Sequence, residues 1–378
     1  MNTHKTFENK TLCFVYGSNL NLNDFDKWLT KRDYRDYRKE EVLGGFNFVK
    51  NVILPDHELA FTRWSETRKG GVLDVREKKG AIVRGALFAA SDKALAALDE
   101  KEGVSSGCYR RKKVKVIDGD GNFIEALTYC VREDRRESFV EPSEEYLKIV
   151  QAGYERFGIP LGQLSAAANN VANRGMLDSL FVYGTLMRGE LRHGCVCPER
   201  LKCALLAESF GRLYLCGDED GYPAMVLDYE DRTRLVQGEF LLYGAGDMPV
   251  ARLDEIEKFD GYKDLSRNFY NRTVIEVGMC DGRTRFAWVY VYNGDVSGLR
   301  ELKEKCWREF RGSRKKVLAV IADEHAQGIG PVDPEKFYGY GDIGDIPEGM
   351  SFAEALECGL ISERKLAQSS GKWTVVIS

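Results

Sequence analysis

The stretch FVYGSNL, from Phe14 to Leu20, is repeated almost unchanged as FVYGTLM, from Phe181 to Met187. A similar acidic segment follows each copy, LDEKEG at 98–103 and LDEIEK at 253–258. The strand-like stretches CYRRKKVKV and FYNRTVIEV come next in the two halves. Because three landmarks occur twice in the same order, we infer an internal duplication and expect two related domains with a further segment after them.

The composition is that of a globular protein without a strong charge bias. Of the 378 residues, 43% are hydrophobic and 30% are charged, and the formal net charge is −4. Each half can therefore bury a core, and the net charge gives no general attraction to nucleic acid or to an anionic membrane. We interpret the basic runs at 110–115 and 311–316 as solvated faces, and we expect neither nucleic acid nor a membrane as a partner.

The ends and the cysteines indicate a cytoplasmic protein. The first residues, MNTHKTFENK, have neither the apolar core nor the cleavage pattern of a signal peptide. No window approaches the ~18 apolar residues of a membrane helix. We interpret the ten cysteines as reduced thiols. The group His193, Cys195, Cys197 and Cys203 lacks the paired spacing of a zinc site, so no metal is expected there.

The order of elements predicts the fold class. In each half an apolar run ends at Gly-Ser or Gly-Thr, which is typical of a buried strand that enters a tight loop. Several strand-like pieces, a short helix and further strands follow in both halves. This order is neither a βαβ alternation nor an all-β pattern. We therefore predict an α+β fold, in which each domain is a small, mostly antiparallel barrel with flanking helices.

Helix starts and domain boundaries follow from capping residues and composition. The first helix is expected to be capped by Asn23 or Asp24 and to continue to about Thr30. Further helices are predicted at 91–101, 143–158, 249–258 and 299–311, and from Ser351. The predicted domains cover 1–165 and 178–295, with an Ala/Asn-rich linker at 166–177 and a helical extension of unassigned role at 296–378.

The repeated landmarks also point to chemistry. A loop after a Tyr-Gly strand end presents backbone N–H groups, which suit a carboxylate or an oxyanion. Glu102 and Glu257 lie at the expected helix ends, where the helix dipole disfavours a negative charge. Burial in a pocket as a proton carrier would explain that placement. Each motif alone is more typical of a plain turn or a solvated helix, whereas the repeated combination indicates a site.

Taken together, these motifs resemble the γ-glutamylcyclotransferase family, also called AIG2-like or BtrG-like. In that family a YGSN or YGTL loop holds the γ-glutamyl group, and a glutamate in an LDxxEG-like segment carries protons. The first half also contains PSEEYLKIVQAGYERFGIP, which is similar to the C-terminal helix of the classical cyclotransferases. The second half resembles the γ-glutamylamine branch. It departs from the pattern at Lys258, where glycine is usual, and it has no PSxxY helix.

The resemblance implies roles for particular residues. Glu102 and Glu257 correspond to the catalytic proton carriers. The residues expected to contact substrate are Tyr16, Gly17, Ser18, Asn19, Leu20 and Tyr146 in the first half, and Tyr183, Gly184, Thr185 and Leu186 in the second. We interpret Tyr109 and Tyr270 as pocket walls, and Arg111 and Arg272 as surface residues or as partners of local acids.

The implied reaction is an intramolecular aminolysis. The α-amine of a γ-glutamyl amide closes a five-membered ring on the γ-carbonyl, and the products are 5-oxoproline and a free amine. Because the nucleophile belongs to the substrate, no serine or cysteine nucleophile, metal or other cofactor is expected.

Alternatives remain open at this stage. One half could catalyse while the other is degenerate, or the protein could bind γ-glutamyl metabolites without turnover. The nature of the leaving amine and a packing of the two halves on each other are also left open.

Overall fold

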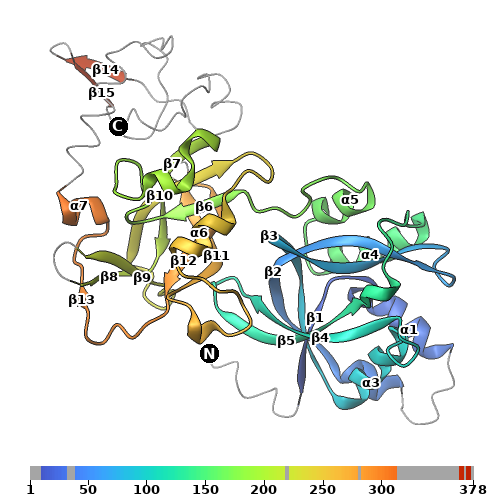
Figure 1. The fold of residues 1–378 in the computed structure, drawn as a ribbon. Coiled ribbons are helices and arrows are strands. Elements are labelled where there is room, and N and C mark those ends of the chain that lie inside the picture. Colours follow the sequence, from blue (N-terminus) through green and yellow to red (C-terminus); the bar gives the residue numbers. More distant parts are fainter. Residues whose placement is uncertain are drawn as a thin grey trace. The chain divides into compact units, whose positions relative to one another are not determined.

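The computed structural model describes residues 10–31, 39–217, 221–279 and 282–312, and the backbone of two short strands, β14 (Leu366–Ser369) and β15 (Lys372–Val375). The chain divides into two compact units, Met1–Met176 and Leu177–Ser378 (Figure 1). Within the described ranges, no helix is long and apolar enough to cross a membrane. The helix expected from Ser351 lies outside the described residues.

Each unit contains a closed five-stranded barrel, which confirms the predicted α+β fold (Figure 1). The first barrel consists of β1 (Thr11–Val15), β3 (Gly70–Ala90), β2 (Phe46–Ser65), β4 (Tyr109–Ile117) and β5 (Phe123–Val131), in that spatial order. The second consists of β6 (Ser179–Val182), β10 (Leu235–Tyr243), β7 (Leu201–Phe210), β11 (Tyr270–Met279) and β12 (Thr284–Tyr292). The two orders are equivalent, so the duplication seen in the sequence extends to the topology.

The two barrels also close at equivalent positions. In the first, β1 and β5 run parallel and pair at Cys13 and Leu127. In the second, β6 and β12 run parallel and pair at Leu180 and Trp288. Cys13 and Leu180 each directly precede the repeated Phe-Val-Tyr. The other strand pairs of the described barrels are antiparallel, as expected.

Helices and short strands complete the two units. The first unit has α1 (Leu22–Thr30), α2 (Lys39–Gly44), α3 (Asp92–Lys101), α4 (Glu144–Arg156) and α5 (Gly162–Ala168). The second has α6 (Val250–Ile256) and α7 (Trp307–Arg311), and a small sheet of β13 (Arg300–Glu301), β8 (Arg212–Cys216) and β9 (Tyr222–Val226). The short 3-10 turns are η2 (Ser18–Leu20), η3 (Glu133–Arg135), η4 (His193–Val196), η5 (Pro198–Arg200) and η6 (Leu265–Arg267).

The predicted helix starts at Ser91 and Ser143 are confirmed, and the predicted cap of the first helix is wrong. Ser91 caps α3 and Ser143 caps α4, each by accepting a backbone N–H with its side chain. The first helix is capped by Asn21 and not by Asn23 or Asp24. The turn η2 leads directly into Asn21, whose extended backbone lets its side-chain oxygen accept the N–H of Asp24 at 3.1 Å.

The helix predicted over 299–311 is wrong for its first part. Arg300 and Glu301 form β13, which pairs with β8, and the N–H of Leu302 donates to Leu213 O at 2.8 Å. Helix α7 covers only Trp307–Arg311. The hydrogen bonds to the neighbouring strand and the burial of Leu302 and Trp307 override the local helix preference of this charged segment.

The segment 166–177, expected as a linker, packs on the first barrel over much of its length. It begins inside α5, and Arg174 is buried, with its Nε donating to Leu59 O at 2.9 Å. The N–H of Ile82 donates to Gly175 O at 2.7 Å. The first compact unit accordingly extends to Met176.

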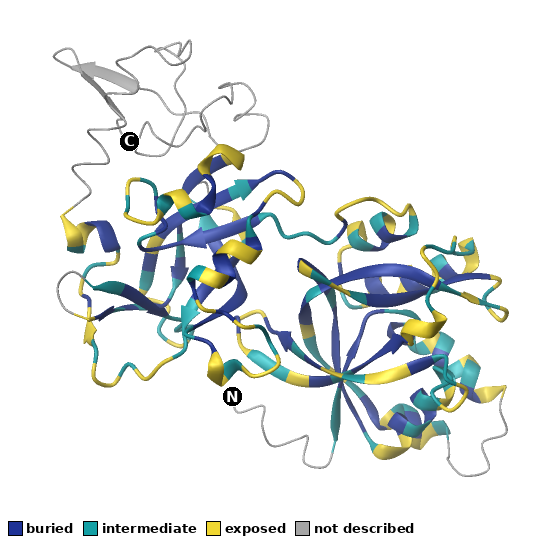
Figure 2. Ribbon diagram, viewed as in Figure 1, coloured by how far each residue is buried: buried dark blue, intermediate teal, exposed yellow. Residues whose placement is uncertain are grey.

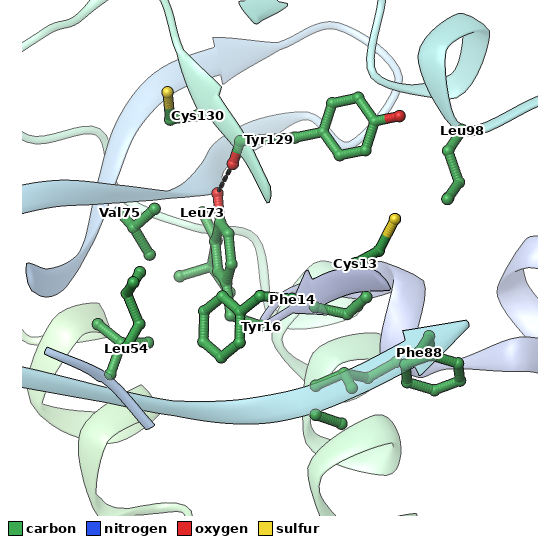
Figure 3. Packing of buried hydrophobic residues seen from close by; sticks show 14 of the residues in the cluster. Cys13, Phe14, Tyr16, Leu54, Leu73, Val75, Phe88, Leu98, Tyr129 and Cys130 are labelled. Atoms are coloured by element: carbon green, nitrogen blue, oxygen red, sulfur yellow. Dashed lines mark hydrogen bonds between the residues drawn. The ribbon is translucent and has the colours of Figure 1, made fainter. Parts of the chain in front are cut away.

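The barrel strands carry the core, while the loops and outer helix faces are exposed (Figure 2). In the first barrel, Phe14, Leu54 and Phe88 are among the side chains packed together in Figure 3, and each is at most 2% exposed. Burial of a side chain of this size contributes about 1.5–3 kcal/mol. Packing of this kind holds β1 in place, and the end of β1 leads into the first Tyr-Gly loop.

Candidate functional site

The first candidate pocket lies at the end of β1. It contains about 460 Å³ of empty space, counted out to its open mouth. Six of the seven residues predicted for this half line it, namely Tyr16, Gly17, Ser18, Asn19, Glu102 and Tyr146. The structure therefore brings the loop, the end of α3 and the first turn of α4 to one cavity. The other lining residues, which the sequence did not single out as contacts, are Cys13, Phe14, Val15, Leu73, Leu98, Tyr109 and Tyr129.

Leu20 is the predicted first-half residue that does not line the pocket. Its side chain is fully buried, and α4 packs so closely on it that a Cβ at Gly153 would lie 2.6 Å from Leu20 Cβ. Its N–H is also engaged, since it donates to Gly17 O at 3.0 Å. Leu20 therefore anchors the loop to the core.

Helix α4 holds the first loop through hydrogen bonds on both sides of it in the sequence. The hydroxyl of Tyr154 donates to Tyr16 O at 3.0 Å, and Asn21 Nδ2 donates to Ile149 O at 2.9 Å. In the described part of the chain, the N–H groups of Gly17, Ser18 and Asn19 have no backbone acceptor. They are held next to the pocket and are available to an anionic group.

Glu102 follows the last residue of α3 and faces the loop. Asn19 Nδ2 donates to its Oε1 at 2.6 Å. Burial raises the pKa of the Glu102 carboxyl, and the charge of Lys101 and the Asn19 hydrogen bond act in the opposite direction. The Glu102 side chain is thus half-buried and hydrogen-bonded, and it lies at a helix end, as the sequence predicted.

A polar network surrounds this carboxylate. Lys101 Nζ donates to Asn19 Oδ1 at 2.6 Å and to Asp24 Oδ2 at 3.3 Å. Arg68 binds Asp24 with both terminal nitrogens, at 2.9 and 2.6 Å. Burial lowers the pKa of the Lys101 ammonium. Lys101 and Arg68 are therefore already engaged by Asp24, which the sequence considered only as a helix cap, while a third nearby cation, Arg63, donates to Cys108 Sγ at 3.0 Å.

The second candidate pocket lies at the end of β6 and contains about 430 Å³ of empty space, counted out to its mouth. All five residues predicted for this half line it, namely Tyr183, Gly184, Thr185, Leu186 and Glu257. The remaining lining residues are Phe181, Val182, Arg192, Tyr222, Pro223, Tyr270 and Tyr290. The loop has the same backbone pattern as the first, because the N–H of Met187 donates to Gly184 O at 2.9 Å.

Glu257 is more buried than Glu102. It is 8% exposed, and burial raises its pKa to about 7, opposed by the charge of Arg192. The duplication explains the difference, because Leu186 takes the position of Asn19 and Ile256 that of Lys101. In the described part of the chain no side chain donates a hydrogen bond to the Glu257 carboxylate. Two carboxylates in equivalent positions thus have different surroundings.

The tyrosines of the two pockets hold equivalent backbone carbonyls. Tyr16 donates to Tyr129 O at 2.6 Å, seen in Figure 3, and Tyr183 donates to Tyr290 O at 2.7 Å. Likewise, Tyr109 donates to Leu73 O at 2.8 Å and Tyr270 to Pro223 O at 2.9 Å. Burial raises the pKa of each of these four hydroxyls. They therefore stay protonated and shape the pocket walls.

An Asp–Arg–Tyr group lies next to each pocket, and its tyrosine lines the pocket. Asp99 accepts from Arg111 Nε at 2.7 Å and from the Tyr129 hydroxyl at 2.8 Å. In the second unit, Asp254 lies 2.8 Å from Arg272 Nε and accepts from the Tyr290 hydroxyl at 2.7 Å. The aspartate belongs to the repeated LDExE and the arginine to the repeated Tyr-x-Arg.

The two copies of this group differ in burial. The side chains of Arg111 and Asp99 are 36% and 30% exposed, whereas those of Arg272 and Asp254 are 0% and 3% exposed. The Arg272 guanidinium also lies 4.5 Å from the Trp288 ring centroid. The prediction that these arginines pair with local acids is confirmed, while the alternative of a surface position does not hold for Arg272.

Helix α7 supports the second loop. Arg308 Nη2 donates to Arg188 O and to Glu239 Oε1, both at 2.6 Å. Glu239 Oε2 in turn accepts the N–H of Arg188 at 2.8 Å. Arg188 directly follows the repeated stretch, so α7 holds the loop from outside the repeated region. No feature of the sequence indicated this role.

The group of His193 and cysteines suggests no metal site. His193 Nδ1 lies 3.1 Å from Leu186 O, and Cys197 Sγ lies 3.4 Å from Arg252 Nη1. Within the described residues, no group of three or more His, Cys, Asp or Glu side chains is placed to hold a metal ion.

The loop glycines differ in the space around them, which predicts unequal effects of alanine. A Cβ at Gly184 would lie 2.3 Å from Pro223 Cγ, whereas one at Gly17 would lie 3.8 Å from Leu73 Cβ. Because the proline ring cannot rotate away, Gly184→Ala should destabilise the second domain by about 1–3 kcal/mol. Gly17→Ala should change the stability by less than about 1 kcal/mol. Thermal unfolding of the two variants tests this difference, and equal shifts would contradict it.

Comparisons with known proteins assign the family. A family described as "Gamma-glutamyl cyclotransferase, AIG2-like" matches residues 180–309, and one described as "AIG2-like family" matches residues 82–163. The gamma-L-glutamyl-butirosin B gamma-glutamyl cyclotransferase of Niallia circulans is 33% identical over 138 residues, which cover 36% of this chain and 80% of that protein. The chain belongs to the γ-glutamylcyclotransferase, AIG2-like family.

A second relative agrees with this membership. The gamma-glutamylcyclotransferase of Homo sapiens is 32% identical over 158 residues, which cover 41% of this chain and 75% of that protein. A solved structure named gamma-glutamyl cyclotransferase is 29% identical to this chain. The match covers 40% of this chain and 82% of the chain in that structure, with a TM-score of 0.33. The family match over residues 180–309 extends into α7 and includes most of that helix. At the level of the family, the two matched regions imply a small γ-glutamyl substrate.

Proposed function

We propose that the protein is a γ-glutamylcyclotransferase that releases 5-oxoproline and a free amine from γ-glutamyl amides. One observation carries the proposal. Each pocket combines a Tyr-Gly loop with a glutamate whose pKa is raised by burial. In each loop the N–H groups of the glycine and the two residues after it have no backbone acceptor among the described residues. Both parts are needed for this chemistry, because binding of a γ-glutamyl group requires only the loop.

The reaction needs no nucleophile from the protein. The α-amine of the substrate forms a C–N bond with the γ-carbonyl carbon, and the carbonyl oxygen becomes an oxyanion. The N–H groups of the loop would stabilise this oxyanion or bind the α-carboxylate. The pocket favours the reaction by holding the chain in the folded-back conformation that ring closure requires.

Glu102 or Glu257 would move the proton. The carboxylate takes a proton from the attacking nitrogen and returns it to the leaving nitrogen, after which the original amide C–N bond breaks. Such a carrier works best when its pKa lies close to the working pH. For Glu257, the pKa of about 7 meets this condition. The Asn19 hydrogen bond to Glu102 would in addition orient that carboxylate towards the substrate.

Glutamine substitutions test the proposal. The purified protein is incubated with γ-glutamyl amino acids and γ-glutamyl amines, and 5-oxoproline is measured by mass spectrometry. Because glutamine keeps the shape of glutamate but cannot take up the proton, Glu102→Gln and Glu257→Gln should each lower turnover in their own domain by about 10²–10⁴-fold. The double variant should then release almost no 5-oxoproline.

Matched controls lie in the same helices. Glu100 and Glu255 are exposed two residues before the proposed carriers, so Glu100→Gln and Glu255→Gln should retain turnover. If one single variant abolishes turnover, one half is catalytic and the other is degenerate. If the wild type binds a panel member but releases no 5-oxoproline from any of them, the protein is a binding module and the proposal is wrong.

A further inference from the structure

The second pocket has a cation at its mouth. Among the lining residues, all of which are described, Arg192 alone is exposed, whereas Glu257 and Pro223 are buried and Tyr222 is half-buried. The N–H of Arg192 donates to Thr185 O at 2.8 Å, which fixes its backbone against the loop. Arg192 is therefore attached to the site but lies where the pocket opens.

The guanidinium of Arg192 forms no ion pair with any described residue. Its charge nevertheless reaches the pocket, because it lowers the pKa of both Glu257 and Tyr222 against the opposing effect of burial. A cation that faces a pocket without an acidic partner is available to an anionic ligand group.

The first pocket offers no equivalent cation. No Lys or Arg lines it, and three cations lower the pKa of Glu102 from outside the lining. Lys101 and Arg68 both bind Asp24, with side chains 6% and 21% exposed, and Arg63 Nη2 donates to Cys108 Sγ at 3.0 Å. The charges of Lys101 and Arg68 are compensated by Asp24 before any substrate enters. The two pockets therefore differ in that an arginine lines the second and no cation lines the first.

The proposed chemistry sets the direction of the substrate. The γ-carbonyl has to lie between the loop at Gly184–Leu186 and Glu257, and Gly184, Leu186 and Glu257 are buried. The substituent of the leaving nitrogen must then extend towards the mouth, where Arg192 and Tyr222 lie. Whatever the leaving amine carries beyond its nitrogen comes close to the Arg192 guanidinium.

We propose that Arg192 makes the second domain selective for γ-glutamyl amides whose leaving amine carries a carboxylate, such as γ-glutamyl amino acids. This inference rests on the proposed function and names its substrate class. An ion pair at a partly solvated mouth is modest, so we expect about a five- to tenfold preference in kcat/KM over an uncharged analogue. The preference should shrink as salt is added, because exposed charges are screened.

The experiment uses two substrates of the same shape, γ-glutamyl-alanine and γ-glutamyl-alaninamide. Turnover is measured in the full chain carrying Glu102→Gln, so that only the second domain contributes. The expected result is a preference for γ-glutamyl-alanine, which Arg192→Gln reduces to near unity and Arg192→Lys partly restores. Arg200→Gln serves as the control, since Arg200 is also exposed in this unit but does not line the pocket. A chain carrying Glu257→Gln reports the first domain, whose pocket Arg192 does not line, so Arg192→Gln should leave its relative turnover of the two substrates unchanged.

The outcomes separate this inference from the function on which it rests. If the second domain releases 5-oxoproline equally fast from both substrates, the selectivity is wrong and the cyclotransferase proposal stands. If the preference persists in Arg192→Gln, another group recognises the carboxylate and the role of Arg192 is wrong. If the second domain releases 5-oxoproline from neither substrate nor from any panel member, both proposals fail for this domain. Because Arg192 is exposed, circular dichroism and thermal unfolding should show a folded variant.

Discussion

Replacing Asp254 by asparagine is expected to lower the free energy of unfolding of the second domain by about 3 kcal/mol or more. Asp254 and Arg272 form an ion pair whose side chains are 3% and 0% exposed. Asparagine keeps the size of the side chain and can still accept from the Tyr290 hydroxyl, but it leaves the Arg272 charge buried without its counter-charge. Removal of one partner of such a buried pair typically costs about 3–5 kcal/mol.

The first domain provides the matched control for this prediction. The equivalent Asp99 pairs with Arg111 at a partly exposed position, so Asp99→Asn should cost less than about 1 kcal/mol. Hydrogen exchange of peptides from β11 and β4 would report the two domains separately. Equal losses in the two domains would contradict the argument from burial. Replacing both Asp254 and Arg272 by apolar residues should recover most of the loss, because no unpaired charge then remains.

Replacing Glu257 by glutamine is expected to stabilise the protein at high pH and not at low pH. The pKa of this carboxyl is about 7 in the folded chain and 4.5 when unperturbed. Well below pH 4.5 the carboxyl is protonated in both the folded and the unfolded chain, so it does not lower the free energy of unfolding. As the pH rises from 4.5 to 7, the unfolded chain ionises first, so the folded chain progressively loses stability relative to it.

The full effect is reached above pH 7. At about 1.4 kcal/mol per tenfold change in the ionisation constant, the loss amounts to about 3 kcal/mol. Because glutamine does not titrate, the difference in unfolding free energy between Glu257→Gln and the wild type should grow by this amount from pH 4 to pH 8. The exposed Glu255→Gln should show no such growth. A difference that does not change with pH would mean that the Glu257 carboxyl is well solvated.

The same titration predicts the pH dependence of turnover in the second domain. The carboxylate has to be ionised to accept the proton of the attacking amine, so turnover should rise as the pH increases through about 7. This gain in base strength and the loss in stability have one cause, which is burial of Glu257 without a hydrogen-bond donor among the described residues.

Local features of the sequence predicted much of the fold and the site. The helix starts at Ser91 and Ser143 could be predicted because each depends on residues that are close in the chain. The duplication and the α+β barrels could be predicted because the same motifs and strand-like stretches occur in the same order in both halves. The glutamates at the helix ends and the Tyr-Gly loops could be predicted because the same combination occurs twice. The cap of the first helix could not be predicted, and neither could the strand β13 and the short helix α7, since these features depend on contacts with other elements.

The sequence by itself determined that two pockets would each combine a loop and a glutamate, because short motifs carry that information. Only the tertiary structure decided how the two pockets differ. Asn19 and Glu102 are 83 positions apart, and Arg308 reaches Glu239 across 69 positions, so neither contact can be derived from local pattern. Burial likewise depends on the whole packed barrel. It gives Glu257 its raised pKa and encloses the Arg272 pair, whereas the equivalent Arg111 pair remains partly exposed.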